Sequence, residues 1–170
     1  CSTRKNVDEL FYELKNDSVP VTRYHAGLSK NERKLNQDSF INDETPVIVA
    51  TNAFGMGIDK SNVSFVIHYN MPGDIESYYQ EAGRAGRDGS DASCVLLFSP
   101  SDIILQKWFI NNAEDNHYLS ESQQRELKKL RLEKLQQMVD YCKNEICLRN
   151  HILRYFGENP TQRCGNCSFC

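Results

Sequence analysis

The sequence predicts an α/β protein with a doubly wound, mainly parallel sheet, followed by a small helical module. Strand-like runs alternate with amphipathic helical segments up to residue 98, as is typical of β-α-β units. Helical patterns alone follow the break at residues 99–102, Ser-Pro-Ser-Asp. Four of the seven cysteines lie between residues 147 and 170, which indicates a metal site. We therefore expect two domains, residues 1–101 and 102–170.

The composition fits a globular protein. Its 170 residues are 39% hydrophobic, enough for one full domain and a small second one. No apolar run reaches the length of ~18 residues that a membrane span needs, so we expect no membrane partner and a cytosolic location. The net charge is −3. Any contact with nucleic acid must therefore depend on local groups instead of a global field.

The first expected element is an amphipathic helix over residues 6–14, because its apolar residues recur at i, i+3, i+4 and i+7. Residues 1–3 are expected to end a strand that precedes them. Arg4 and Lys5 at the helix start are equally compatible with a DNA contact and with an ordinary basic first turn.

Residues 20–24 read as a strand, and His25 follows it in a turn. A histidine there is more often a polar turn residue than a functional one. Ser29 and Glu32 have the spacing of a capping box, which predicts a helix through residue 41.

The next strand is expected at residues 46–50, a continuous apolar run typical of a strand covered on both faces. Thr51 and Asn52 would then emerge at the carboxyl edge of a parallel sheet, where ligands bind in open α/β folds. The glycines at 55 and 57 would let the backbone approach a phosphate or sugar closely. A simple turn would require neither both glycines nor the preceding threonine.

An arginine-rich segment follows the next expected strand, residues 63–69. A helix is predicted over residues 75–84, and residues 80–89 read Gln-Glu-Ala-Gly-Arg-Ala-Gly-Arg-Asp-Gly. Arg84 and Arg87 are three apart, so they would share one face of a helix end, and a guanidinium can grip phosphate with two bonds. The alternative is a solvated Arg/Glu helix end with a glycine turn. A strand over residues 93–98 closes the sheet.

The C-terminal part is expected to hold helices at residues 103–112 and 122–142. The second has an apolar stripe formed by Leu127, Leu130, Leu135, Met138 and Val139. This stripe could belong to a helical hairpin or to a dimer seam, and fewer than three clean heptads favour packing within the chain. The basic residues at 128–131 are interpreted as a solvated face.

The clustered cysteines predict a structural zinc site. The thiol of Cys147, at the start of a helix over residues 147–156, would join three thiols from the segment Cys164-Gly165-Asn166-Cys167-Ser168-Phe169-Cys170. Four thiols complete a tetrahedral shell, so His151 is expected on the helix surface. An iron–sulfur cluster is the main alternative, and a redox Cys-x-x-Cys is a weaker one.

Two motif blocks resemble those of a known family. Residues 50–59, Ala-Thr-Asn-Ala-Phe-Gly-Met-Gly-Ile-Asp, and residues 80–89 resemble the fifth and sixth helicase motifs of superfamily 2, in the form found in RecQ DNA helicases. Residues 147–170 resemble the RecQ zinc-binding subdomain, with Cys142 as a spare cysteine. The resemblance implies a RecA-like second motor domain and a zinc module of an ATP-dependent helicase that unwinds duplex DNA.

The resemblance also implies roles for individual residues. Arg87, as the arginine finger, and Arg84 would reach the phosphates of ATP. The other implied contacts are with nucleotide for Gly57, Asp59, Gln80 and Gly83, with DNA for Thr51, Arg4, His25 and Asn52, and with zinc for Cys147, Cys164, Cys167 and Cys170.

The sequence has no Gly-x-x-x-x-Gly-Lys-Ser/Thr loop and no Asp-Glu-x-His stretch, which in helicases hold the phosphates and Mg²⁺. The resemblance therefore implies that ATP and Mg²⁺ bind with a first motor domain preceding Cys1, and that a winged-helix domain follows Cys170. Expected partners are single-stranded DNA and duplex junctions, at a nucleoid or in a nucleus, in DNA repair, recombination or replication. The alternative is a non-catalytic, zinc-containing binding or interaction module.

Overall fold

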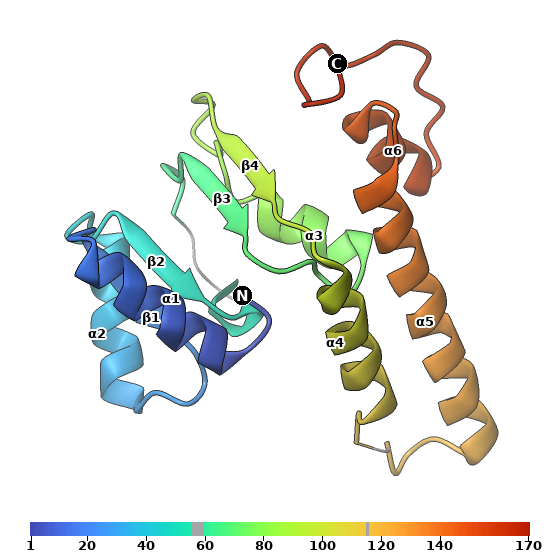
Figure 1. The fold of residues 1–170 in the computed structure, drawn as a ribbon, viewed down its shortest axis with the longest axis horizontal. Helices are drawn as coiled ribbons and strands as arrows, with labels where there is room; N and C mark the ends of the chain where they lie inside the picture. Colours follow the sequence, from blue (N-terminus) through green and yellow to red (C-terminus); the bar gives the residue numbers. More distant parts are fainter. Residues whose placement is uncertain (56–59, 115) are drawn as a thin grey trace. The chain divides into compact units, whose positions relative to one another are not determined.

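A computed structural model describes residues 1–55, 60–114 and 116–170 (Figure 1). Its strands are β1 (Val21–Tyr24), β2 (Val47–Ala50), β3 (Phe65–His68) and β4 (Ser93–Leu96). Its α-helices are α1 (Arg4–Asn16), α2 (Lys30–Ile41), α3 (Ile75–Ala82), α4 (Pro100–Asn111), α5 (Glu121–Lys143) and α6 (Leu148–Tyr155), and Asn52–Gly55 forms a 3-10 helix. The described part of the chain therefore has the predicted order of elements.

The strands form two parallel pairs, each built as a β-α-β unit. β1 pairs with β2 from Val21 opposite Val47 onward, and helix α2 connects them. β3 pairs with β4 from Phe65 opposite Ser93 onward, and helix α3 lies between them in the chain. The predicted parallel α/β class is confirmed. Among the described residues, hydrogen bonds join the strands into two separate two-stranded sheets.

Local capping explains where the first two helices begin. The side chain of Thr3 accepts a hydrogen bond from the amide of Asn6 at the start of α1. At α2, the Ser29 hydroxyl accepts from the Glu32 amide while the Glu32 carboxylate accepts from the Ser29 amide. This is the capping box that the sequence predicted.

The chain divides into two compact units. The first comprises Cys1–Met71 and Gln80–Leu97, and the second comprises Pro72–Tyr79 and Phe98–Cys170. The division falls within helix α3. The predicted domain boundary at residues 101 and 102 stays a prediction.

Helix α5 supplies most of the apolar core of the second unit. Leu135, Met138 and Val139 are buried as predicted, whereas Leu130 is 47% exposed. The stripe prediction was therefore wrong at Leu130. Helices α4 and α5 pack against each other as a hairpin within the chain. In the described residues, no helix combines the length and apolar character needed to cross a membrane.

Substitution of two leucines of α5 tests whether Leu135 belongs to the apolar core and Leu130 lies outside it. Leu135→Ala should lower the free energy of unfolding of the second unit by about 2–5 kcal/mol, because it leaves a cavity at a fully buried position. Leu130→Ala is the matched control and should cost less than about 1 kcal/mol. Urea unfolding followed by the fluorescence of Trp108, the single tryptophan, measures both. Equal losses would contradict the burial pattern.

Candidate functional site

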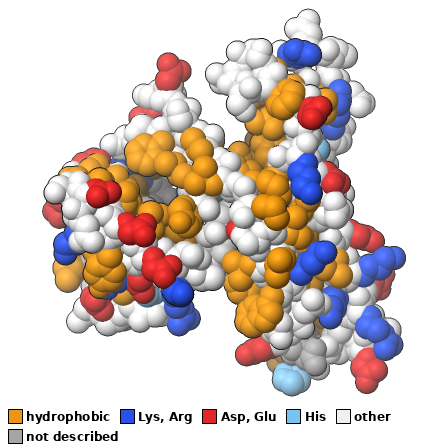
Figure 2. Space-filling model, in the orientation of Figure 1, with side chains coloured by type: hydrophobic (Ala, Val, Ile, Leu, Met, Phe, Trp, Pro, Cys, Tyr) orange, Lys and Arg blue, Asp and Glu red, His pale blue; other side chains and the backbone are white. Residues whose placement is uncertain are grey.

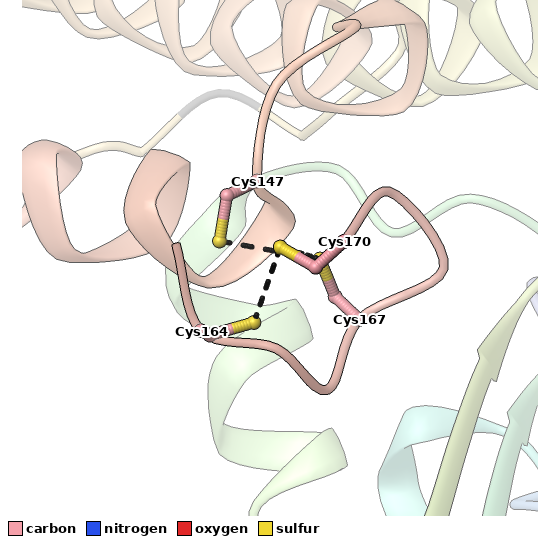
Figure 3. A group of neighbouring side chains, drawn as sticks. All are labelled: Cys147, Cys164, Cys167 and Cys170. Carbon is pink, nitrogen blue, oxygen red and sulfur yellow. Dashed lines mark hydrogen bonds between the residues drawn. The ribbon is translucent and has the colours of Figure 1, made fainter. Parts of the chain in front are cut away.

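Four cysteines converge in the second unit. Cys147 is the N-cap of α6, and Cys164, Cys167 and Cys170 lie in the loop that follows this helix. Their sulfur atoms all lie within 4.8 Å of one another, and Figure 3 shows the four side chains pointing toward a common centre. The loop reverses at Gly165, whose φ of +66° lies in the left-handed region that favours glycine.

The spacing of the thiols fits a single tetrahedral ion. A zinc ion with Zn–S bonds of about 2.3 Å requires S–S separations of about 3.8 Å. The observed Sγ–Sγ distances are 3.8 Å for Cys164–Cys170, 4.0 Å for Cys147–Cys167 and 3.5 Å for Cys167–Cys170. Soft thiolates in a tetrahedron are the ligand set of structural zinc.

Backbone amides around the cluster favour the thiolate form. Burial acts to raise the pKa of Cys167, but hydrogen bonds from the amides of Leu148 and Phe169 outweigh it and lower that pKa to about 6. Burial acts to raise the pKa of Cys147 as well, but hydrogen bonds from the amides of Asn150 and Cys164 and from the neighbouring thiols together outweigh it and lower that pKa. Both effects favour a bound cation, since the thiolate is the form that binds metal.

Cys142 and His151 are outside the cluster. Cys142 is half-buried on α5, and burial, followed by the nearby Asp102 carboxylate, raises its pKa to about 12. His151 is a half-buried residue of α6 that meets the ring of Tyr141 edge-on at 5.4 Å and, as predicted, is not part of the cysteine cluster. Burial lowers the pKa of His151.

Three segments of the first unit converge near the carboxyl ends of β1 and β2. The Thr51 amide donates to the carbonyl of Tyr24 at 3.1 Å, which places Thr51 beside the end of β1. A Cβ added to Gly27 would lie 3.2 Å from Cδ of Arg4. The structure therefore places both Arg4 and Thr51 beside the turn that ends β1, and their contacts with DNA stay a prediction. Asn52 follows and is exposed.

His25 lies in this region, but both nitrogens of its imidazole contact other groups of the protein. It is 5% exposed; its Nε2 lies 3.1 Å from Oδ1 of Asp8, and its Nδ1 accepts from the Gly27 amide at 3.1 Å. Because Nδ1 accepts a bond and a carboxylate cannot donate one, Nε2 carries the proton. His25 thus holds the turn against α1, and its contact with DNA stays a prediction. Asp8, which also pairs with Arg23, was missed from the sequence.

The arginines lie in a turn and not in a helix. Helix α3 ends at Ala82, so the predicted extension of this helix to Arg84 was wrong. We call residues 83–89 the arginine turn. Gly86 has a φ of +67°, and a Cβ there would lie 2.9 Å from the carbonyl oxygen of Ser90, so the backbone path requires glycine.

The two arginines of the arginine turn differ in their exposure to solvent. Arg87 is exposed and its Nε donates to the carbonyl of Gly83 at 3.2 Å, whereas Arg84 is half-buried. Gln80 and Gly83, the predicted nucleotide contacts, are also exposed. Gly57 and Asp59 lie outside the described residues.

Comparison with known proteins identifies the family of this chain. The family model described as helicase conserved C-terminal domain matches residues 1–89, and the model described as RecQ zinc-binding matches residues 100–170. The ATP-dependent DNA helicase RecQ of Bacillus subtilis is 53% identical over 99% of the chain. The chain belongs to the RecQ helicase family.

Relatives from other organisms extend the RecQ match. The RecQ-like DNA helicase BLM of Xenopus laevis is 40% identical over 94% of this chain and 11% of its own length. The Putative ATP-dependent RNA helicase R290 of Acanthamoeba polyphaga mimivirus is 38% identical over 100% of the chain and 29% of its own length. The chain spans 27% of the B. subtilis relative and 26% of the RecQ of Pasteurella multocida, so it corresponds to about a quarter of these bacterial RecQ proteins.

Solved structures of other proteins share the fold of this chain. The yeast DEAD-box splicing factor Prp28 has a TM-score of 0.53 and 24% identity over 79% of this chain and 26% of that chain. A DEAD box protein from the hyperthermophile Methanococcus jannaschii has a TM-score of 0.55 and 24% identity over 65% of this chain and 31% of that chain.

The RecQ zinc-binding match and the four converging thiols together show a structural zinc site.

Single cysteine substitutions test which thiols bind the zinc. Replacing Cys147, Cys164, Cys167 or Cys170 by Ser should remove the metal, because a hydroxyl is a poor substitute for a thiolate, and should make the helical unit sensitive to protease. Cys142→Ser is the matched control and should retain one zinc per chain. Elemental analysis of the purified variants measures the outcome. Zinc lost from the Cys142 variant but kept in the Cys147 variant would contradict the assignment, and iron with acid-labile sulfide would replace zinc.

Proposed function

We propose that this chain is the second motor domain and zinc module of an ATP-dependent DNA helicase that unwinds duplex DNA. The observation that carries the proposal is the arginine turn, which presents Arg87 to solvent on a backbone shaped by glycine. An exposed guanidinium on a defined turn is accessible to an anionic ligand from solvent. In phosphoryl transfer, such an arginine stabilises the charge that develops on the transferred group.

The nucleotide would occupy a cleft completed by another part of the protein. The sequence lacks the glycine-rich lysine loop and the acidic pair that hold phosphates and Mg²⁺, so these groups are assigned to a preceding motor domain. Gly57, Asp59, Gln80 and Gly83 would face the nucleotide from this side. Arg84, which is less exposed than Arg87, would contact the phosphates and help to fix the turn.

The DNA strand would follow the carboxyl ends of β1 and β2. Thr51 and Asn52 offer a hydroxyl, an amide and backbone donors there, and Arg4 adds a positive charge. Such groups bind phosphates and fix the register of a strand without reading its sequence. His25 would act by holding the turn through Asp8, because its imidazole is buried.

DNA is proposed as the polymer because the B. subtilis, P. multocida and X. laevis relatives are named DNA helicases, although the mimivirus relative is named a putative RNA helicase. The setting would be a bacterial nucleoid or a nucleus, in DNA repair, recombination or replication. A following winged-helix domain would complete the protein.

Basic and acidic side chains are interspersed on the face of helix α5 seen in Figure 2, and the ion pair between Lys129 and Glu133 contributes to that pattern. The basic residues of α5 are therefore assigned no part in DNA binding.

The arginine finger is tested in the complete protein. Arg87→Ala should lower kcat of the DNA-stimulated ATPase by about 10³- to 10⁵-fold with ATP binding largely intact, because a finger acts on the transition state more than on the ground state. Arg125→Ala, an exposed arginine on α5, is the control and should leave kcat unchanged. Steady-state ATP hydrolysis and nucleotide binding measure the two effects. Retained ATPase would favour the non-catalytic module instead.

The isolated 170-residue chain provides a second test. Because the phosphate loop and the Mg²⁺ ligands are assigned to another domain, the purified chain should show no ATP turnover and at most weak DNA binding. Hydrolysis of radiolabelled ATP with and without single-stranded DNA measures this. Robust turnover would overturn the model of a cleft shared between two domains.

A further inference from the structure

The position of the arginine turn depends on a small number of contacts within the first unit. Its backbone is held to the segment before β3, since the Gly86 amide donates to the carbonyl of Val63 at 2.9 Å and the Asp88 amide donates to that of Ser61 at 3.3 Å. These bonds fix the middle and the far end of the turn. The near end is continuous with helix α3, which has only eight residues. A helix this short relies on tertiary contacts for its position.

A histidine–carboxylate pair holds the last turn of this helix to the sheet. Nε2 of His68 lies 2.9 Å from Oε2 of Glu81. His68 is the final residue of β3 and is 7% exposed, and its backbone carbonyl accepts the Leu97 amide at 2.9 Å. The imidazole is therefore carried by a strand end that is itself fixed by the pairing with β4. A hydrogen bond to a carboxylate in such a buried setting is stronger than a neutral one.

Glu81 connects this pair directly to the arginine turn. Its side chain bonds His68, while its backbone carbonyl accepts the amide of Arg84 at 3.3 Å. The next residue, Ala82, accepts a hydrogen bond from the thiol of Cys94 on β4 at 3.5 Å. A shift of Glu81 would thus be transmitted through one hydrogen bond to the backbone that carries Arg84, and three residues later to Arg87.

We propose that His68 and Glu81 are a positioning pair that sets the placement of Arg84 and Arg87 for phosphoryl transfer. The inference rests on the proposed role of the arginines, and neither His68 nor Glu81 touches the nucleotide in it. Errors of about 1 Å in the placement of a catalytic group can cost about 100-fold in rate. The pair therefore affects the rate of the chemical step more than the affinity for ATP.

The test uses kcat and KM for ATP of the DNA-stimulated ATPase of the complete protein. Glu81→Ala should lower kcat by about 10- to 100-fold, while KM changes by less than about 3-fold. Glu81→Gln keeps an oxygen that accepts the Nε2 proton of His68, so it should retain most of the activity. The control, Asp91→Ala, replaces an exposed carboxylate beyond the arginine turn and should leave both constants unchanged. Equal losses in the Glu81→Gln and Glu81→Ala variants would overturn the proposal.

A double-mutant cycle separates positioning from general destabilisation. In a background with both Arg84→Ala and Arg87→Ala, Glu81→Ala should reduce the single-turnover rate by less than about 3-fold further, because its effect passes through the arginines already removed. His68→Ala combined with Glu81→Ala should lose no more activity than Glu81→Ala alone. Independent, multiplicative losses would assign the pair a merely structural role and overturn the proposal. Thermal unfolding and zinc content confirm that each variant is folded.

The two proposals fail in different ways. If Arg87→Ala loses its ATPase but Glu81→Ala retains full kcat, the positioning pair is overturned and the arginine finger stands. If Arg87→Ala retains its ATPase, the finger is overturned, and the pair falls with it because it has no catalytic arginine to position.

Discussion

Parallel pairing of the strands is the constraint on which the first unit depends. In a β-α-β unit both strands end at the same edge of the sheet, so residues that follow each strand become neighbours although a helix separates them in sequence. The bond between the Thr51 amide and the Tyr24 carbonyl is a direct product of this geometry. Arg4 joins the same region because α1 packs against β1. The proposed contact with a strand of DNA therefore depends on local polar groups and needs no global positive charge.

The two buried histidines of the first unit have the same structural role, which is to hold a helix against the end of a strand. His25 directly follows β1 and bonds Asp8 of α1, while His68 ends β3 and bonds Glu81 of α3. Each imidazole ties a strand end to a helix through a carboxylate. An imidazole suits this position because it can donate to the carboxylate from one nitrogen and accept from a backbone amide at the other, as His25 does with Gly27. The polar loops beside these pairs are thereby fixed.

The second unit depends on its metal site in a different way. Leu135, Met138 and Val139 form part of a small apolar core on α5, and the loop after α6 has no described strand or helix of its own. Four thiols within 4.8 Å of one another would be bound together by one ion, and the free energy of metal binding becomes folding free energy. The cysteines therefore replace the apolar contacts that so short a segment cannot make.

The sequence by itself determined the element order, the helix caps, the family and the four clustered cysteines, because each follows from neighbours along the chain. The Ser29 capping box and the Cys-x₂-Cys-x₂-Cys run are local patterns of this kind. Only the tertiary structure decided that His25 is buried, that Leu130 is exposed and that Arg84 lies beyond the end of α3. It alone also revealed Asp8 and Glu81, whose histidine partners are 17 and 13 residues away in sequence. A side chain's partner at that distance depends on how strands and helices pack, and no local pattern of residues encodes it.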